Sequence, residues 1–229
     1  MGRPNLFALN TWASHESRVL EIFCRALSKL AAQKRLPTRE DDLNRELFRF
    51  ARKENYELIK KGRGSQSSLL YEANNQPAAD DLVRAKRESK RPDFQCGFVD
   101  AQIGVDRFFV LEGKRLGQPS SNSWVLNENY ITNGIQRFVH AEWAYGQDAS
   151  SGVMIGYIQS MTMDEILEEV NNCGKSHKVP EIAAIVGGQN GLVQFQHRLD
   201  RSFPETPYRL IHVWANLRKR SSSRAIKVA

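Results

Sequence analysis

The sequence predicts an α/β (α+β) domain in which helices flank a mixed central sheet. Three observations support this class. Apolar side chains recur at three- and four-residue spacing within residues 13–58, which is typical of amphipathic helices. Two apolar segments, 94–100 and 107–114, lie on either side of a turn at Gly104, as in an antiparallel hairpin. The near-continuous apolar run 153–158 is typical of a strand that is covered on both faces.

The N-terminal part of the chain predicts two helices. The first covers residues 13–34, and Pro37 ends this unit. Thr38 then has the position of an N-cap, with Asp41 completing an approximate capping box, and the second helix runs to about Leu58. The apolar stripe of the first helix consists of Val19, Ile22, Phe23, Ala26, Leu27 and Leu30. Packing into the core is the expected use of this stripe, and association with a second chain is the alternative.

Further elements are expected along the rest of the chain. A short strand at 68–72 follows a loop, and helical spacing recurs between Tyr130 and Trp143. The last expected elements are a helix capped by Thr162 or Asp164 that runs through Val170, two strands at 192–199 and 208–217, and a polar tail.

Composition narrows the classes of function. The 229 residues carry a formal net charge of +7, which favours polyanionic partners, because each phosphate neutralised by Lys or Arg releases counterions. The basic run 84–91 ends directly before Pro92-Asp93, although a solvated face is an equal alternative for such a run. No apolar run approaches the roughly 18 residues that span a membrane, and no secretory signal is present, so a cytoplasmic location is expected. Three widely separated cysteines argue against a disulfide framework or a structural zinc site.

The residues with the clearest chemical meaning are Pro92-Asp93 and Glu112-Gly113-Lys114. Side chains of a strand alternate between its two faces, so Glu112 and Lys114 project together while Gly113 faces away. Ten or eleven residues lie on each side of the hairpin turn, which places Asp93 opposite the end of the strand that carries Glu112. We expect Gly113 to let another element approach the sheet closely, because it has no side chain.

Two carboxylates and a lysine at one point suit phosphodiester hydrolysis. Oxygen atoms of Asp93 and Glu112 are ligands that Mg²⁺ or Mn²⁺ prefers, and a bound metal acidifies water and neutralises developing charge. Lys114 would orient the attacking water and stabilise the charge of the transition state. The alternative is a surface ion pair worth roughly 0–1 kcal/mol. The apolar flank 108–111 indicates a buried strand instead, where ionisable groups are costly unless they have partners.

The motif Pro92-Asp93 … Glu112-Gly113-Lys114 resembles that of the PD-(D/E)XK nuclease superfamily, which has the restriction-endonuclease-like fold. In order and type of elements, the resemblance extends from roughly Thr38 to Leu217. It implies an αβββαβ core, here with an extra N-terminal helix. It also implies catalysis that depends on Mg²⁺, with Mn²⁺ as a substitute, and a nucleic-acid substrate.

The resemblance implies a further acidic residue as catalytic group and metal ligand. Glu40 is favoured, because it shares the inward stripe of Leu43 and Leu47 on the first core helix. A first-turn acid that favours the helix dipole is its alternative role. Glu46, rotated by about 100° from Leu47, and Glu72, at the end of a predicted strand, stay as other candidates.

Four polar residues are expected to bind nucleic acid. On the later helix, Gln136 or Arg137 would contact a phosphate, since a guanidinium binds phosphate in a bidentate manner. An exposed polar face is the alternative for both. Arg91 and Arg115 directly flank the two halves of the motif and are expected to bind the same substrate.

The predicted organisation is an N-terminal helical extension (1–36), a nuclease domain (37–217) and a basic polar tail (218–229). The expected function is that of a Mg²⁺-dependent DNA endonuclease in prokaryotic genome defence or restriction. A non-catalytic nucleic-acid-binding subunit and an RNA nuclease are the alternatives. Since cutting of a duplex usually needs two active sites, a homo-oligomer or a partner in a defence complex is also expected.

Overall fold

The computed structural model describes residues 11–77, 81–100, 105–182, 184–187, 191–203 and 206–218. Its helices are α1 (Trp12–Ala31), α2 (Glu40–Ile59), α3 (Arg84–Glu88), α4 (Leu126–Tyr130), the π-helical turn η2 (Ile131–Ile135), α5 (Gln136–Val139) and α6 (Met163–Ser176). Its strands are β1 (Leu69–Tyr71), β2 (Phe94–Asp100), β3 (Val105–Leu116), β4 (Ser151–Ile158), β5 (Ala184–Gly187), β6 (Leu192–Leu199) and β7 (Tyr208–Asn216). The hairpin turn at Gly104 and nearly all of the predicted polar tail lie outside the described residues.

The described strands form one mixed sheet in the order β1-β2-β3-β4-β7-β6-β5. The pairs β1–β2 and β2–β3 are antiparallel, β3–β4 and β4–β7 are parallel, and the pairs β6–β7 and β5–β6 are antiparallel. Every residue of the central strand β4 is buried, as expected for the apolar run 153–158. The sheet therefore has a parallel centre with antiparallel strands toward both edges.

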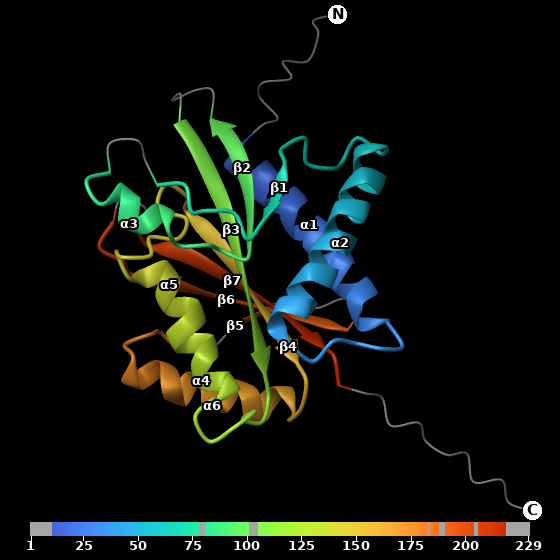
Figure 1. Ribbon diagram of the computed structural model, residues 1–229, viewed down its shortest axis with the longest axis vertical. Coiled ribbons are helices and arrows are strands. Elements are labelled where there is room, and N and C mark those ends of the chain that lie inside the picture. Colours follow the sequence, from blue (N-terminus) through green and yellow to red (C-terminus); the bar gives the residue numbers. More distant parts are fainter. Residues whose placement is uncertain are drawn as a thin grey trace, which may run out of the picture.

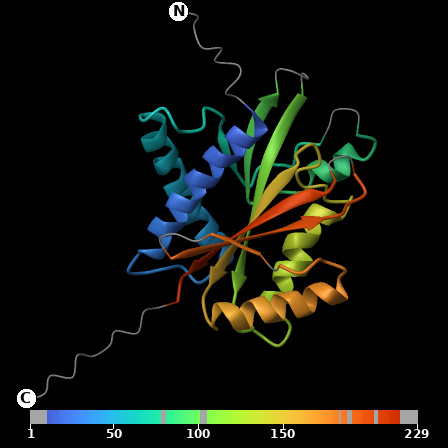
Figure 2. The same cartoon turned by 180° about the vertical axis from the view of Figure 1, so that it is seen from behind.

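Helices cover both faces of this sheet (Figure 1). On one face, α1 and α2 bury an apolar cluster against β2, β3, β4 and β7. On the other face, α4, η2, α5 and α6 cover a second cluster, and the view from behind shows the same separation of the two helical layers (Figure 2). The predicted class, a mixed sheet flanked by helices, is confirmed.

Helix α1 belongs to the core of the molecule. Its N-cap Thr11 accepts a hydrogen bond from the backbone N–H of Ser14 at 3.2 Å. The six residues of the predicted stripe are 0–2% exposed and pack in the same cluster as α2 and the sheet. The stripe is therefore covered within the chain, and its alternative use in association with a second chain is wrong.

The start of α2 differs from the sequence prediction. Its N-cap is Arg39, which makes no side-chain capping hydrogen bond, so the capping box of Thr38 and Asp41 is wrong. The carbonyl of Thr38 accepts instead from the side chains of Arg115 at 3.4 Å and Gln159 at 3.0 Å. These contacts join the turn before α2 to the ends of β3 and β4, and they override the local capping signal. The helix ends close to the predicted position.

Strands β2 and β3 form the predicted antiparallel hairpin. Their register pairs Phe94 with Leu111 and Gly97 with Phe108. Asp93, which precedes Phe94, therefore lies next to Glu112, as the count of residues on each side of the turn requires.

The helical spacing predicted between Tyr130 and Trp143 is only partly realised. The helix begins earlier, at Leu126, and consists of α4, η2 and α5 in succession. It ends at Val139, because His140 has an extended backbone (ψ 127°). Trp143 consequently lies in the segment after the helix rather than on its face.

The C-terminal half follows the prediction with two changes. Thr162 is the residue that caps α6, in a capping box with Glu165, and the helix continues past Val170 to Ser176. Strand β5 was not predicted, since a segment of four residues is too short to show a period. The late strands β6 and β7 lie where predicted.

Two expectations from composition can be compared with the structure. Cys24, Cys96 and Cys173 are free, as predicted. Among the helices of the described residues, none combines the length and the apolar character that crossing a bilayer requires.

Candidate active site

The motif residues meet where β3 continues beyond β2. Strand β2 begins at Phe94, so the last residues of β3 pair with β4 on one side only. On the open side, Asp93 Oδ2 accepts from the backbone N–H of Gly113 at 2.7 Å, and Glu40 Oε2 accepts from the N–H of Arg115 at 3.2 Å. Two carboxylates thus take the places that a neighbouring strand would fill, because backbone N–H groups need acceptors. This edge fixes both carboxylates side by side.

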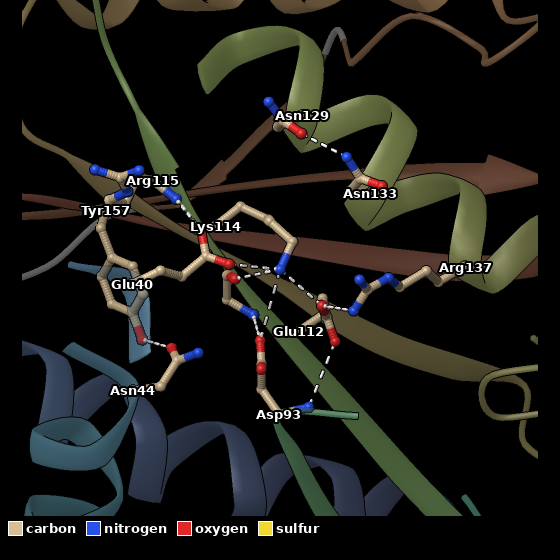
Figure 3. A network of polar contacts seen from close by, with 11 residues as sticks. Glu40, Asn44, Asp93, Glu112, Lys114, Arg115, Asn129, Asn133, Arg137 and Tyr157 are labelled. Carbon is tan, nitrogen blue, oxygen red and sulfur yellow. Dashed lines mark hydrogen bonds and ion pairs between the residues drawn. The ribbon is translucent and has the colours of Figure 1, made fainter. Parts of the chain in front are cut away.

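Lys114 lies at the centre of the edge and faces three carboxylates (Figure 3). Its Nζ donates to Glu40 Oε1 and to Glu112 Oε1, each at 2.8 Å, and lies 3.9 Å from Asp93 Oδ2. The side chain is only 6% exposed, so the ammonium depends on these carboxylates for partners. The structure therefore brings together the four residues predicted to be catalytic.

Glu112 is the most enclosed of the three acids, with a side chain that is 0% exposed. Its Oε1 accepts from Lys114 and from Nη1 of Arg137, and its Oε2 accepts from the backbone N–H of Asp93 at 3.4 Å. Arg137 belongs to α5, so Glu112 links the strand to the helical layer above it. A buried carboxylate requires such partners, because an unpaired buried charge is strongly destabilising.

The crowding of carboxylates changes the protonation of Asp93. Burial, together with the negative charge of Glu112, raises the pKa of Asp93 to about 8 in spite of the nearby ammonium of Lys114. Burial alone would lower the pKa of Lys114, but the charges of Glu112, Asp93 and Glu40 hold that pKa above its usual range. At neutral pH the cluster therefore contains a protonated Asp93 beside a charged Lys114.

Gly113 permits the close approach that was predicted for it. A Cβ at this position would lie 2.5 Å from Oδ1 of Asn44 on α2 and 3.1 Å from Cε2 of Tyr157 on β4. The hydroxyl of Tyr157 donates to Asn44 Oδ1 at 2.7 Å. Since Asn44 lies about one helical turn after Glu40, this contact holds the first turn of α2 at the sheet and so positions the carboxylate of Glu40.

The π-helical turn η2 packs against the other side of Lys114. A Cβ on Gly134 of this turn would lie 2.4 Å from Cε of Met154 and 3.4 Å from Cγ of Lys114. Asn129 and Asn133 lie above Lys114 in the view of Figure 3, and Asn133 donates to Asn129. The aliphatic part of Lys114 is therefore enclosed by the helix while its ammonium meets the acids. Turns of this kind are rare and often occur at functional sites.

Arg137 is held against an aromatic ring. Its guanidinium lies 4.4 Å from the ring centre of Trp143, and Nζ of Lys90 lies 4.2 Å from the same centre. The ring of Tyr145 makes an edge contact with Trp143 at 5.8 Å, and its hydroxyl is buried beside Arg137. Burial and the charge of Glu112 raise the pKa of this hydroxyl. Sequence reasoning missed Trp143 and Tyr145 as site residues, because they lie after the helix in a segment without a motif.

The structure distinguishes the three acids that were candidates for the additional catalytic residue. Glu40 reaches Lys114, as described above. Glu46 forms an exposed ion pair with Arg49, and Glu72 is exposed just after β1. Glu40 is therefore the acid that the fold adds to the motif.

The four residues predicted to bind nucleic acid have different surroundings. Arg137 lies at the acid cluster. Arg91 is exposed and directly precedes Pro92 in the sequence. Arg115 is partly buried at the end of β3. Gln136 is only 8% exposed, and its side chain donates to the carbonyl of His177 at 3.0 Å. Gln136 thus joins α5 to the end of α6.

The donor atoms of the cluster have the chemistry of a site for Mg²⁺ or Mn²⁺. Among the described residues, no group of three or more His, Cys, Asp or Glu side chains has the arrangement of a metal site. Each carboxylate has a cation or an N–H of the protein as a partner instead. The oxygens of Glu40, Asp93 and Glu112 nevertheless lie within 3.9 Å of one cationic atom, Lys114 Nζ, and carboxylate oxygens are the ligands that these metals prefer.

Comparison with known proteins gives no family for this chain. No family model matches the sequence, no curated protein matches it, and no solved structure matches its fold. What the chain does is therefore inferred from its own residues.

Proposed function

We propose that this protein is a divalent-metal-dependent nuclease that hydrolyses phosphodiester bonds, with DNA as its substrate. The observation that carries the proposal is the convergence of Glu40, Asp93 and Glu112 on Lys114 at the open edge of β3. Burial of ionisable groups costs stability, and a cluster with a strongly shifted pKa is typical of a functional site.

The order of elements around the site supports the proposal. The αβββαβ core that the resemblance implies has the same order as α2, β1, β2, β3, the helix of α4 to α5, and β4. Helix α1 precedes this series, and the short helix α3 is inserted between β1 and β2. Asp93 directly precedes β2, and Glu112 and Lys114 lie near the end of β3. We infer a restriction-endonuclease-like core from this order.

The residues have separate parts in the reaction that we propose. Asp93 and Glu112, with Glu40, would hold Mg²⁺ or Mn²⁺. When bound, such an ion acidifies water and neutralises charge on the phosphate. Lys114 orients the attacking water and stabilises the negative charge that develops on the phosphate oxygens. Arg137 offers its guanidinium to the phosphate backbone of the substrate from the side of α5.

Incubation of plasmid DNA with the protein and Mg²⁺ or Mn²⁺ tests this chemistry. We expect the wild type to nick the plasmid. We expect Asp93→Asn and Lys114→Met each to nick it more slowly, by a factor of about 100 or greater. Asp93→Asn keeps an oxygen that can accept from the N–H of Gly113, so the loss reports the charge rather than the hydrogen bond. Glu46→Gln is the matched control, because this acid also lies on α2 but pairs with Arg49 outside the cluster. Undiminished nicking by both site variants would contradict the proposal.

A non-catalytic nucleic-acid-binding subunit is the second candidate. Every carboxylate of the cluster already has a hydrogen-bond partner within the protein, and this favours the second candidate. Calorimetry with Mn²⁺ separates the two candidates. Metal binding that Asp93→Asn weakens supports the nuclease, whereas DNA binding without any metal binding supports the subunit. The nicking assay repeated with RNA tests the alternative substrate.

The proposal extends to the setting of the reaction. We infer a role in prokaryotic genome defence, with a second copy of the chain or another subunit to cut the opposite strand. Sedimentation of the protein with and without duplex DNA tests the assembly.

A further inference from the structure

Two cations, Lys90 and Arg137, lie against the indole ring of Trp143 beside the acid cluster. Nζ of Lys90 and the guanidinium of Arg137 lie 4.2 and 4.4 Å from the ring centre of Trp143. Lys90 precedes β2 and Arg137 belongs to α5, so separate segments of the chain meet at this ring. Such contacts stabilise each cation without neutralising its charge.

The group is built into the fold by hydrogen bonds. Asn75 is 4% exposed, and its side chain donates to the carbonyl of Trp143 at 2.9 Å. The backbone N–H of Asn75 donates to the carbonyl of Lys90 at 2.7 Å. Arg87 Nε also donates to the carbonyl of Ala141 at 2.7 Å. The segment that carries Lys90 is therefore tied to the segment that carries the ring.

The positive charge of the group is not balanced. Lys90 forms no ion pair within the part of the chain that the structure describes. Arg137 has one acidic partner, Glu112, and that carboxylate is shared with Lys114. A guanidinium has five N–H donors, so Arg137 has donors to offer beyond the contact of Nη1 with Glu112. Both cations thus keep charge and donors that a phosphate could take.

We propose that Lys90, Trp143 and Arg137 form a second phosphate-binding subsite, which holds the phosphate next to the one that is cut. The proposal rests on the nuclease function and deepens it, because it defines the substrate as a polynucleotide with consecutive phosphates. Arg137 contacts Glu112 directly, so a phosphate bound here lies one side chain away from the acid cluster. The indole ring keeps both cations in place and leaves their charge available to the substrate.

Binding in the absence of metal tests the subsite independently of cleavage. The probe is a short DNA duplex, followed by fluorescence anisotropy in EDTA over a range of salt concentrations. We expect Lys90→Ala to weaken binding several-fold and to reduce the slope of log Kd against log salt by about 0.9, the value for one phosphate contact. Lys90→Arg keeps the cation and is expected to retain the slope. Lys86→Ala is the matched control, since Lys86 lies nearby but pairs with the exposed Glu142 at 3.5 Å.

Cleavage of DNA with single methylphosphonates locates the contact, because each of these groups removes the charge of one phosphate. With the products of every bond separated on a gel, the wild type is expected to cut poorly at the bond next to the neutral group. Lys90→Ala, although slower, is expected to cut that bond as readily as its neighbours. Equal sensitivity of both proteins would overturn the subsite.

The two proposals fail in different ways. A salt slope that Lys90→Ala leaves unchanged overturns the subsite even if the wild type cleaves DNA. A reduced slope in a protein that does not cleave DNA supports the subsite and contradicts the nuclease function.

Discussion

Asp93 is the residue on which the state of the cluster depends most. Its carboxyl accepts from the N–H of Gly113, faces the ammonium of Lys114 and lies beside the buried Glu112. With a pKa of about 8, it keeps a proton at neutral pH when no metal is bound. A divalent cation would favour the charged form, since metal ligands must lose their protons. The site therefore couples metal binding to the ionisation of a single carboxyl group.

The raised pKa of Asp93 has a consequence for stability. Its pKa is about 8 in the folded state and near 3.9 in an unfolded chain, so the folded state binds more protons between these values. The stability that neutral Asp93 contributes is fully present below about pH 4 and is lost as the pH rises through about 8. Without metal, we expect the wild type to lose stability relative to Asp93→Asn between about pH 5 and pH 9.

Urea denaturation at several pH values measures this difference. Glu46→Gln, which removes an acid outside the cluster, is expected to show no such trend relative to the wild type. A constant difference between wild type and Asp93→Asn over the whole range would show that Asp93 has an ordinary pKa.

At the scale of elements, β3 organises the site through its alternation and its open edge. Glu112 and Lys114 lie on the face where Val110 and Leu116 join the cluster under α4 to α6. Gly113 lies on the face of α1 and α2, where Asn44 fills the space of the missing side chain. The alternation was predictable from the sequence, because the period of a strand is two. The partners of the open edge were not, because they come from α2 and from the residue before β2.

Gly113→Ala tests the close packing at this strand. The added Cβ would lie 2.5 Å from Oδ1 of Asn44, so we expect a loss of about 1–3 kcal/mol in the free energy of unfolding. Gly97→Ala is the matched control in β2, where a Cβ would meet only the ring of Phe108 at 3.4 Å. The double variant Gly113→Ala/Asn44→Ala is expected to recover part of the loss. Urea denaturation measures all four proteins, and equal losses for the two glycine variants would refute the explanation.

At the scale of the whole molecule, the site lies between the two helical layers, at the end of β3 that β2 leaves unpaired. Glu40 comes from the layer of α1 and α2, and Arg137 comes from the layer of α4 to α6 (Figure 3). The acids reach Lys114 because β2 begins only at Phe94 and leaves the end of β3 open between these layers. The geometry of the cluster therefore depends on the packing of both layers, including α1.

Removal of residues 1–36 tests the place of α1 in the core. We expect the shortened chain to lose cooperative unfolding, because α1 shares one apolar cluster with Phe94, Leu111 and Ile155. Within the full chain, Ile22→Ala is expected to cost about 2–5 kcal/mol, whereas Ser17→Ala on the exposed side of α1 is expected to cost little. Urea denaturation measures these effects. A shortened chain that unfolds cooperatively at the midpoint of the full chain would show that residues 1–36 form a separate extension.

The sequence by itself determined the main helices, the hairpin and the adjacency of Asp93, Glu112 and Lys114. These features depend on local periods and on the number of residues around one turn, which act between residues close in the chain. Only the tertiary structure decided that Glu40 joins Lys114, which is 74 residues away in sequence. Packing between layers likewise decided the start of α2, the burial of Gln136, and the meeting of Lys90 with Trp143. The physical reason is that these contacts depend on how distant elements fit together, and no local spacing encodes that fit.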